Sequence, residues 1–259
     1  MNTRRKFLFG SLGVITAGAA GVWFGKNRIV KSLLLLKNNE GKVVSAAPAF
    51  DGDCVLTSEA VEGPFFVSSA IRKDIRDGKQ GKELNLKLKL TNAGDCSPVS
   101  NATVEVWHCD AEGVYSGYPE EIAHDLWISM RFLEFKGGHK EPVTEKRFLR
   151  GAQVTDADGV CEFTTIVPGW YEGRCPHIHF KVFTNEKAAF ATQLYLNEDL
   201  TKRIYTSIKP YNKFGESPYN MKNDQVISLS NEHSGVLLNP VWNVSGPLSV
   251  SAKIGLKLS

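Results

Sequence analysis

Residues 84–90 of the chain are Leu84-Asn-Leu-Lys-Leu-Lys-Leu90, in which apolar and polar side chains alternate strictly. Successive side chains of a β-strand point to opposite faces, so this period predicts a strand with one buried and one solvated face. Similar patterns predict further strands at 103–107, 153–155, 161–167, 177–183, 192–196, 226–229 and 248–258. Helical periodicity is scarce, apart from a short helix expected within 119–140. The pattern therefore predicts an all-β sandwich or barrel with long loops.

Length and charge divide the chain into three parts. All-β domains reach about 250 residues, so 259 residues suit one such domain with an appendage. The net charge is +3, but residues 1–31 hold six Lys and Arg and no acid, against 25 basic and 28 acidic residues in the remainder. No basic stripe supports nucleic-acid binding. We expect a leader over 1–31, a linker over 32–50 and a catalytic domain over 51–259.

The leader has the form of an export signal. It begins Thr3-Arg-Arg-Lys-Phe-Leu8, continues without charge to Gly25, and contains Ala17-Gly-Ala19, which suits cleavage. It resembles the twin-arginine signals of bacteria, which export folded proteins. The uncharged run is also long enough to span a bilayer, so an uncleaved membrane anchor is the alternative. We expect a protein located in the periplasm, at the cell surface or outside the cell.

Five cysteines lie beyond the leader, and none forms a Cys-x-x-Cys pair, which disfavours a structural zinc site: Cys54, Cys96, Cys109, Cys161 and Cys175. Disulfides persist in oxidising compartments, and an odd count leaves at least one thiol unpaired within a monomer. The sequence leaves the pairing open, as it does the alternative of buried inert thiols.

The candidate chemistry lies in a histidine pair and two tyrosine turns. In Arg174-Cys-Pro-His-Ile-His179, the histidines are two positions apart on an expected strand, so both imidazoles face one side, as metal ligation requires. Two half-buried structural histidines are the alternative. Turns at Gly113-Val-Tyr115 and Pro168-Gly-Trp-Tyr171 each present a tyrosine, which taken singly is more typical of packing.

Taken together, these stretches resemble the intradiol ring-cleavage dioxygenases, the family of protocatechuate 3,4-dioxygenase and catechol 1,2-dioxygenase. The resemblance rests on the ordered motifs Gly-x-Tyr, Pro-Gly-x-Tyr and Arg-x-x-His-Ile-His, and extends to 57–66, 148–156 and 192–195. It covers roughly residues 54–200. It implies a single Greek-key β-sandwich with long active-site loops.

The resemblance also implies one non-haem ferric ion per chain, with four protein ligands: Tyr115, Tyr171, His177 and His179. Tyr115 and His177 would be equatorial, together with a hydroxide, and Tyr171 and His179 axial. Two hard phenolates and a hydroxide offset the three positive charges of Fe(III), whereas Fe(II) oxygenases use two histidines and a carboxylate.

Two further residues receive roles from the resemblance. Arg174 is expected to stabilise the developing anion, and a structural salt bridge or cation–π contact is its alternative. Gln193 is expected near the substrate, with ordinary sheet hydrogen bonding as its alternative. Tyr171 would leave the metal and take one substrate proton. His108 is expected to be structural.

The implied reaction belongs to aromatic compound catabolism. A catechol-type diol and O2 are the expected partners, and the ring opens between its hydroxyl-bearing carbons to give a cis,cis-muconate-type diacid. The preferred catechol and the oligomeric state stay open. A non-catalytic transthyretin-like binding module and a zinc or copper His-x-His protein are the rival readings. Catechol 1,2-dioxygenases carry a helical segment ahead of the sandwich, and the residues before Leu84 show none, which indicates a single-domain, exported branch of the family.

Overall fold

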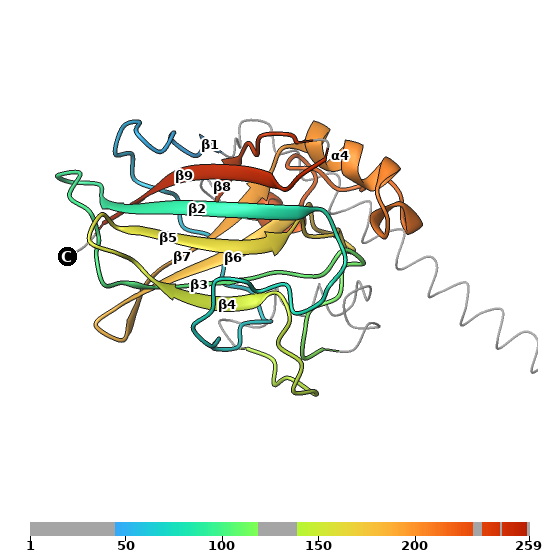
Figure 1. Cartoon of the computed structure of the whole chain (residues 1–259), viewed down its shortest axis with the longest axis horizontal. Coiled ribbons are helices and arrows are strands. Elements are labelled where there is room, and N and C mark those ends of the chain that lie inside the picture. The colour runs from blue at the N-terminus through green and yellow to red at the C-terminus, as the bar shows by residue number, and fades with distance from the viewer. Residues whose placement is uncertain (1–44, 119–138, 230–234, 244, 258–259) are drawn as a thin grey trace, which may run out of the picture. The chain divides into compact units, whose positions relative to one another are not determined.

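The computed structural model describes residues 45–118, 139–229, 235–243 and 245–257 (Figure 1). Its strands are β1 (Ser45–Ala46), β2 (Glu83–Asn92), β3 (Thr103–Trp107), β4 (Arg150–Val154), β5 (Val160–Ile166), β6 (His177–Thr184), β7 (Lys187–Leu196), β8 (Val236–Leu238) and β9 (Leu248–Leu256). Two α-helices, α4 (Glu198–Ser207) and α5 (Gln225–Leu229), and the 3-10 turn η1 (Tyr211–Lys213) complete these elements. The expected short helix within 119–140 lies almost wholly outside the described residues.

The strands form two sheets, and the all-β prediction is confirmed. The larger sheet has the order β1-β8-β7-β6-β3-β4, and the smaller has the order β5-β2-β9. Pairing is antiparallel around β3 and β6, whereas β8 runs parallel to β1 and β7, and β9 runs parallel to β2. Figure 1 shows β2, β5 and β9 in front of the strands of the larger sheet.

The two sheets share one apolar core, and this core decides which way the histidines point. The alternating leucines of β2 are all buried in it, as are Ile178, Phe180 and Val182 of β6. Because side chains alternate along a strand, the other face of β6 carries His177 and His179 away from the core. Those histidines lie beside a separate buried cluster: Phe65, Trp107, Cys109, Tyr115, Tyr118 and Tyr171.

The strand predicted at 226–229 is wrong, because these residues form helix α5. Asp224 Oδ1 accepts the backbone N–H groups of Val226 and Ile227 at 2.8 and 3.0 Å, which is the arrangement of a helix N-cap. This local capping and the burial of Ile227 outweigh the β-propensity of the two β-branched residues.

Helix α4 was missed, although the sequence carries its signals. Asn197 caps the helix by accepting the N–H of Leu200 at 3.2 Å, and Glu198 and Asp199 occupy the first turn. The buried positions Leu200, Thr201, Ile204 and Tyr205 follow the helical period.

The start of the described chain is bound to the sheets. Ser45 and Ala46, within the expected linker, pair with β8 in parallel, and a Cys54–Cys96 disulfide follows. The thiols of Cys109, Cys161 and Cys175 are free and buried. The leader lies outside the described residues, and within the described ones we find no helix of the length and apolarity that crossing a bilayer requires.

Candidate metal centre

Four side chains bring their donor atoms together on the side of β6 that faces away from the core. Tyr115 Oη lies 3.0 Å from His179 Nε2, 3.5 Å from His177 Nε2 and 3.4 Å from Tyr171 Oη. Tyr171 Oη is 3.3 Å from His177 Nε2, and the two Nε2 atoms are 3.1 Å apart. The structure thus joins the four residues that the sequence singled out as candidate ligands.

The two histidines are held in the neutral form that metal ligation requires. The His179 ring stacks on Trp107 of β3, its register partner, with centroids 4.9 Å apart and planes 3° from parallel. His177 Nδ1 donates to the carbonyl of Cys175 at 2.7 Å, which leaves the lone pair on Nε2. Burial, and then the charge of Arg174, lowers the pKa of both histidines well below 6.5.

Tyr115 is fixed by the turn that follows β3. Asp110 Oδ1 accepts two backbone N–H groups of this turn at 3.0 Å. The buried guanidinium of Arg150 donates to Ser116 Oγ at 2.7 Å and to the carbonyl of Phe65 at 2.6 Å. The Phe65 ring in turn stacks on Tyr115, with centroids 4.6 Å apart, so the phenol is held from two sides.

Tyr171 arrives on a second turn that packs against the first. The N–H of Gly169 donates to the carbonyl of Asp110 at 2.9 Å. A Cβ at position 169 would lie 2.6 Å from the carbonyl oxygen of Ala111, so only glycine permits this approach. Burial raises the pKa of Tyr171 to about 12. The pKa of Tyr115 is raised well above 10, mainly by burial and then by repulsion from the neighbouring Tyr171 phenolate. Both side chains are therefore phenols unless a cation stabilises the phenolates.

The spacing of the four donor atoms fits a first-row metal ion. Bonds of about 2.0–2.1 Å to a first-row metal place donors at angles of 90–120° about 2.8–3.6 Å apart. This range includes the five separations of 3.0–3.5 Å in the donor quartet of Tyr115, Tyr171, His177 and His179. Among the described residues, no group of three or more His, Cys, Asp or Glu side chains could hold a metal. The two tyrosines are thus needed to complete a site around the histidine pair.

Comparison with known proteins shows to which family the chain belongs. A protein-family model described as Dioxygenase matches residues 61–211, more than half of the chain. An intradiol ring-cleavage dioxygenase from Tetranychus urticae is 30% identical and superposes with a TM-score of 0.67, covering 80% of this chain and 97% of that one. The chain belongs to the intradiol ring-cleavage dioxygenase family. Enzymes of this family generally depend on non-haem iron.

The curated relatives of the chain are less similar to it in sequence. Hydroxyquinol 1,2-dioxygenase of Corynebacterium glutamicum is 25% identical, over 69% of this chain and 56% of its own length. Catechol 1,2-dioxygenase 1 of Acinetobacter lwoffii is 27% identical, over 55% of this chain and 47% of its own. The chain therefore spans about half the length of the curated relatives that it matches.

Arg174 and Gln193 lie beside the donor quartet. Arg174 Nη1 is 3.5 Å from Tyr171 Oη, and its Nη2 donates to Gln193 Oε1 in a short hydrogen bond. Gln193 Nε2 donates to the carbonyl of Val61 at 2.8 Å. Arg174 also forms the buried salt bridge considered as its alternative, to Asp224 at 3.0 Å.

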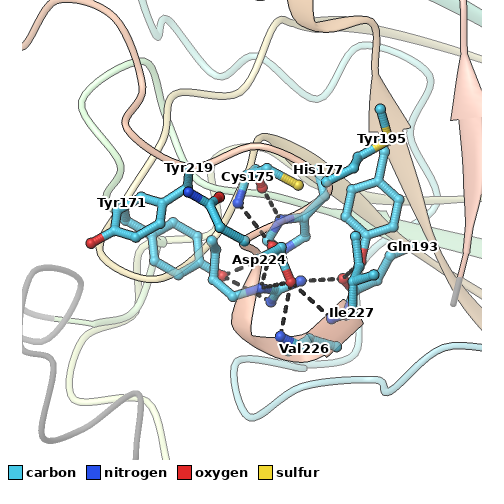
Figure 2. A network of polar contacts seen from close by, with 12 residues as sticks. Tyr171, Cys175, His177, Gln193, Tyr195, Tyr219, Asp224, Val226 and Ile227 are labelled. Atoms are coloured by element: carbon cyan, nitrogen blue, oxygen red, sulfur yellow. Dashed lines mark hydrogen bonds and ion pairs between the residues drawn. The ribbon is translucent and has the colours of Figure 1, made fainter. Parts of the chain in front are cut away.

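No sequence motif pointed to a role for Asp224, which Figure 2 shows at the centre of the polar network beside Tyr171. Its only sequence signal is an acidic residue just before an apolar run, a pattern shared by many helix caps. His108, in contrast, is structural as expected. It is fully buried, with its ring nitrogens 2.7 Å from the Cys109 carbonyl and 2.7 Å from Thr165 Oγ1.

Proposed function

We propose that this chain is a ferric intradiol dioxygenase that cleaves a catechol-type ring between its two hydroxyl-bearing carbons. One C–C bond breaks, and the two oxygen atoms of O2 enter the product, a cis,cis-muconate-type diacid. The observation that carries this proposal is the convergence of two phenols and two imidazoles from three separate parts of the chain, with each donor atom within 3.5 Å of at least two of the others.

A ferric ion held by Tyr115, Tyr171, His177 and His179 would supply Lewis acidity and a template for the two substrate oxygens. Tyr171 is the most accessible of the four, with 7% of its surface exposed against 1% for each of the others. Its oxygen is therefore placed to accept a proton from a substrate hydroxyl.

Arg174 stabilises negative charge in the proposed reaction, and Gln193 orients the Arg174 guanidinium. The guanidinium of Arg174 faces the Tyr171 oxygen and stabilises negative charge that develops there and on the adjacent substrate. Gln193 is fully buried, and its amide oxygen accepts from both Arg174 and the Tyr195 hydroxyl, the latter at 2.8 Å. Gln193 thus holds the guanidinium in place at the edge of the site.

The rival functions leave features of the site unexplained. A binding module that had lost its metal site would lack at least one donor, whereas all four are present and converge. A zinc or copper site built on His177 and His179 gives no role to the two buried tyrosines. No observation favours either alternative.

Spectroscopy of the iron-loaded protein tests the proposal. The protein should show a broad visible band from tyrosinate-to-iron charge transfer, and this band should shift on anaerobic addition of catechol, protocatechuate or hydroxyquinol. Addition of labelled O2 should then place two labelled atoms in one ring-opened diacid. Tyr118→Phe is the matched control, because the Tyr118 hydroxyl donates to the carbonyl of Lys140 at 2.7 Å. A colourless protein with full iron occupancy would falsify the ligand set.

We further propose that the enzyme is exported through its twin-arginine leader. The Cys54–Cys96 disulfide supports this, because disulfides are rare in reducing compartments. Fractionation of the producing cell should find the enzyme outside the cytoplasm, and substitution of Arg4 and Arg5 by Lys should retain it inside. N-terminal sequencing of the exported form decides between a cleaved signal and a retained anchor. A full-length cytoplasmic product with wild-type activity would overturn the proposal.

A further inference from the structure

The buried carboxylate of Asp224 receives hydrogen bonds from two parts of the chain (Figure 2). Its Oδ1 and Oδ2 lie 3.2 and 3.0 Å from Arg174 Nε, and Oδ2 accepts the backbone N–H of Cys175 at 2.8 Å. Oδ1 also accepts the N–H groups of Val226 and Ile227 at the start of α5. Asp224 thus joins the turn that carries Tyr171 to a helix that begins 50 residues later in the sequence.

The contact at Nε fixes the direction of the whole guanidinium. This group is planar and holds its five N–H donors in a rigid fork, so anchoring Nε determines where the two terminal nitrogens point. With Nε on Asp224, Nη1 faces the Tyr171 oxygen at 3.5 Å and Nη2 donates to Gln193. An unanchored arginine side chain would lose this single orientation.

The backbone reinforces the same junction. The N–H of Gln225 donates to the carbonyl of Gly173 at 3.0 Å. Gly173 has a φ of +82°, and a Cβ there would lie 2.3 Å from Gln225 Nε2. The turn from Tyr171 to Cys175 therefore rests directly on the residues that begin α5.

The junction also sets the charge of the site. Arg174 and Asp224 are both buried, with side-chain exposures of 8% and 0%. A buried guanidinium without a counterion is strongly unfavourable, and Asp224 supplies that counterion on the side away from the quartet. The positive end of the pair then faces the Tyr171 oxygen, where the proposed reaction develops negative charge.

We propose that Asp224 is a positioning residue for ring cleavage. It orients the Arg174 guanidinium toward the Tyr171 oxygen and docks the Tyr171 turn on α5. This inference rests on the proposed dioxygenase function, and it assigns Asp224 no contact with substrate or metal.

Asp224→Asn separates the charge from the shape of the side chain. The amide oxygen can still accept the N–H groups of Val226 and Ile227, whereas the amide nitrogen would face the donors of Arg174 and Cys175. We expect iron content at the wild-type level, a KM within about threefold of the wild-type value, and a kcat lower on the order of 100-fold, as misplacement of a catalytic group produces. Asp156→Asn is the control. Asp156 Oδ1 also accepts two backbone N–H groups, in the turn between β4 and β5, but it contacts no residue of the site.

A double-mutant cycle with Arg174→Met distinguishes positioning from a general structural role. If Asp224 acts through Arg174, the double variant should have the kcat of Arg174→Met alone. In iron-free protein, adding Arg174→Met to Asp224→Asn should raise the denaturant midpoint, because the unpaired buried guanidinium is then gone. The proposal is wrong if the kcat losses of the two single variants multiply in the double variant. It is also wrong if the kcat of Asp224→Asn lies within twofold of the wild-type value.

A second variant keeps the test decisive if Asp224→Asn does not fold. Gly173→Ala presses on the Gln225 amide and should lower kcat while iron is retained. Gly215→Ala is its control, because Gly215 has a similar φ of +68° and no atom within 4 Å of a Cβ. Wild-type kcat in Gly173→Ala would count against docking on α5. If the wild-type enzyme itself cleaves no catechol, the dioxygenase function fails, whereas the stability cycle in iron-free protein still tests the Asp224–Arg174 coupling.

Discussion

Gly63→Ala tests whether the segment 61–63, which lies against His179, holds the proposed metal ligands in position. Gly63 has a φ of +77°, and a Cβ there would lie 3.0 Å from His179 Cε1, the carbon bonded to the donor Nε2. The segment cannot easily move away, because Val61 accepts a hydrogen bond from Gln193, and Glu62 pairs with Lys181 at 2.5 Å. Stacking on Trp107 limits movement of the imidazole in turn.

Two effects of different size follow from this geometry. An alanine with positive φ destabilises the fold by roughly 1–2 kcal/mol, wherever it lies. Relief of the contact with His179 requires a further shift of about 0.4 Å to reach ordinary van der Waals separation, which exceeds the tolerance of about 0.2 Å for a metal–ligand distance. We therefore expect iron affinity to fall about 10- to 100-fold, the usual range for changes around metal ligands.

Gly78→Ala is the matched control, because Gly78 has a φ of +75° and no atom within 4 Å of a Cβ. Both variants should show similar losses in urea denaturation, whereas only Gly63→Ala should lose iron in competition with a chelator and alter the visible band. Equal iron affinities in the two variants would refute the idea that Gly63 sets the position of His179.

Three further predictions concern other parts of the molecule. Tyr171→Phe should retain iron on three donors but slow substrate deprotonation about 100-fold or more, measured by anaerobic stopped-flow mixing with catechol. His108→Gln should make the free energy of unfolding depend less steeply on pH between 6.5 and 4. Burial lowers the pKa of His108 from 6.5 to about 4, so its neutral form contributes about 3 kcal/mol above pH 6.5, which is lost as the pH falls to 4. Replacing Cys54 and Cys96 by Ser opens a bridge with a sequence separation of 42 and should lower the free energy of unfolding by about 4 kcal/mol, measured in denaturant without reductant.

Each of these predictions has an outcome that contradicts it. Unchanged deprotonation in Tyr171→Phe would remove that residue as the proton acceptor. A wild-type slope of stability between pH 6.5 and 4 in His108→Gln would show that other groups govern acid unfolding. For the disulfide, Cys161→Ser is the control, since this buried thiol is free, and an equal loss in both variants would indicate a packing effect rather than a loop constraint.

Much of the fold and site could be predicted from local pattern. The strict alternation in 84–90 predicted β2, because one face of that strand packs on the core along its whole length. The His-x-His spacing placed both imidazoles on one face of β6, because a strand has a period of two. The error at 226–229 shows the limit of propensity, since Asp224 caps a helix there in spite of two β-branched residues.

The sequence by itself determined the all-β class, the shared face of His177 and His179, and the presence of two tyrosines on glycine turns. Only the tertiary structure decided that the turns bring both phenols to that face, because the close approach depends on Gly169 packing against the turn that begins at Asp110. Likewise, only the fold paired Arg174 with Asp224 and Cys54 with Cys96. Such pairings depend on how distant strands and helices pack, and local periodicity carries no information about contacts between segments 40 or more residues apart.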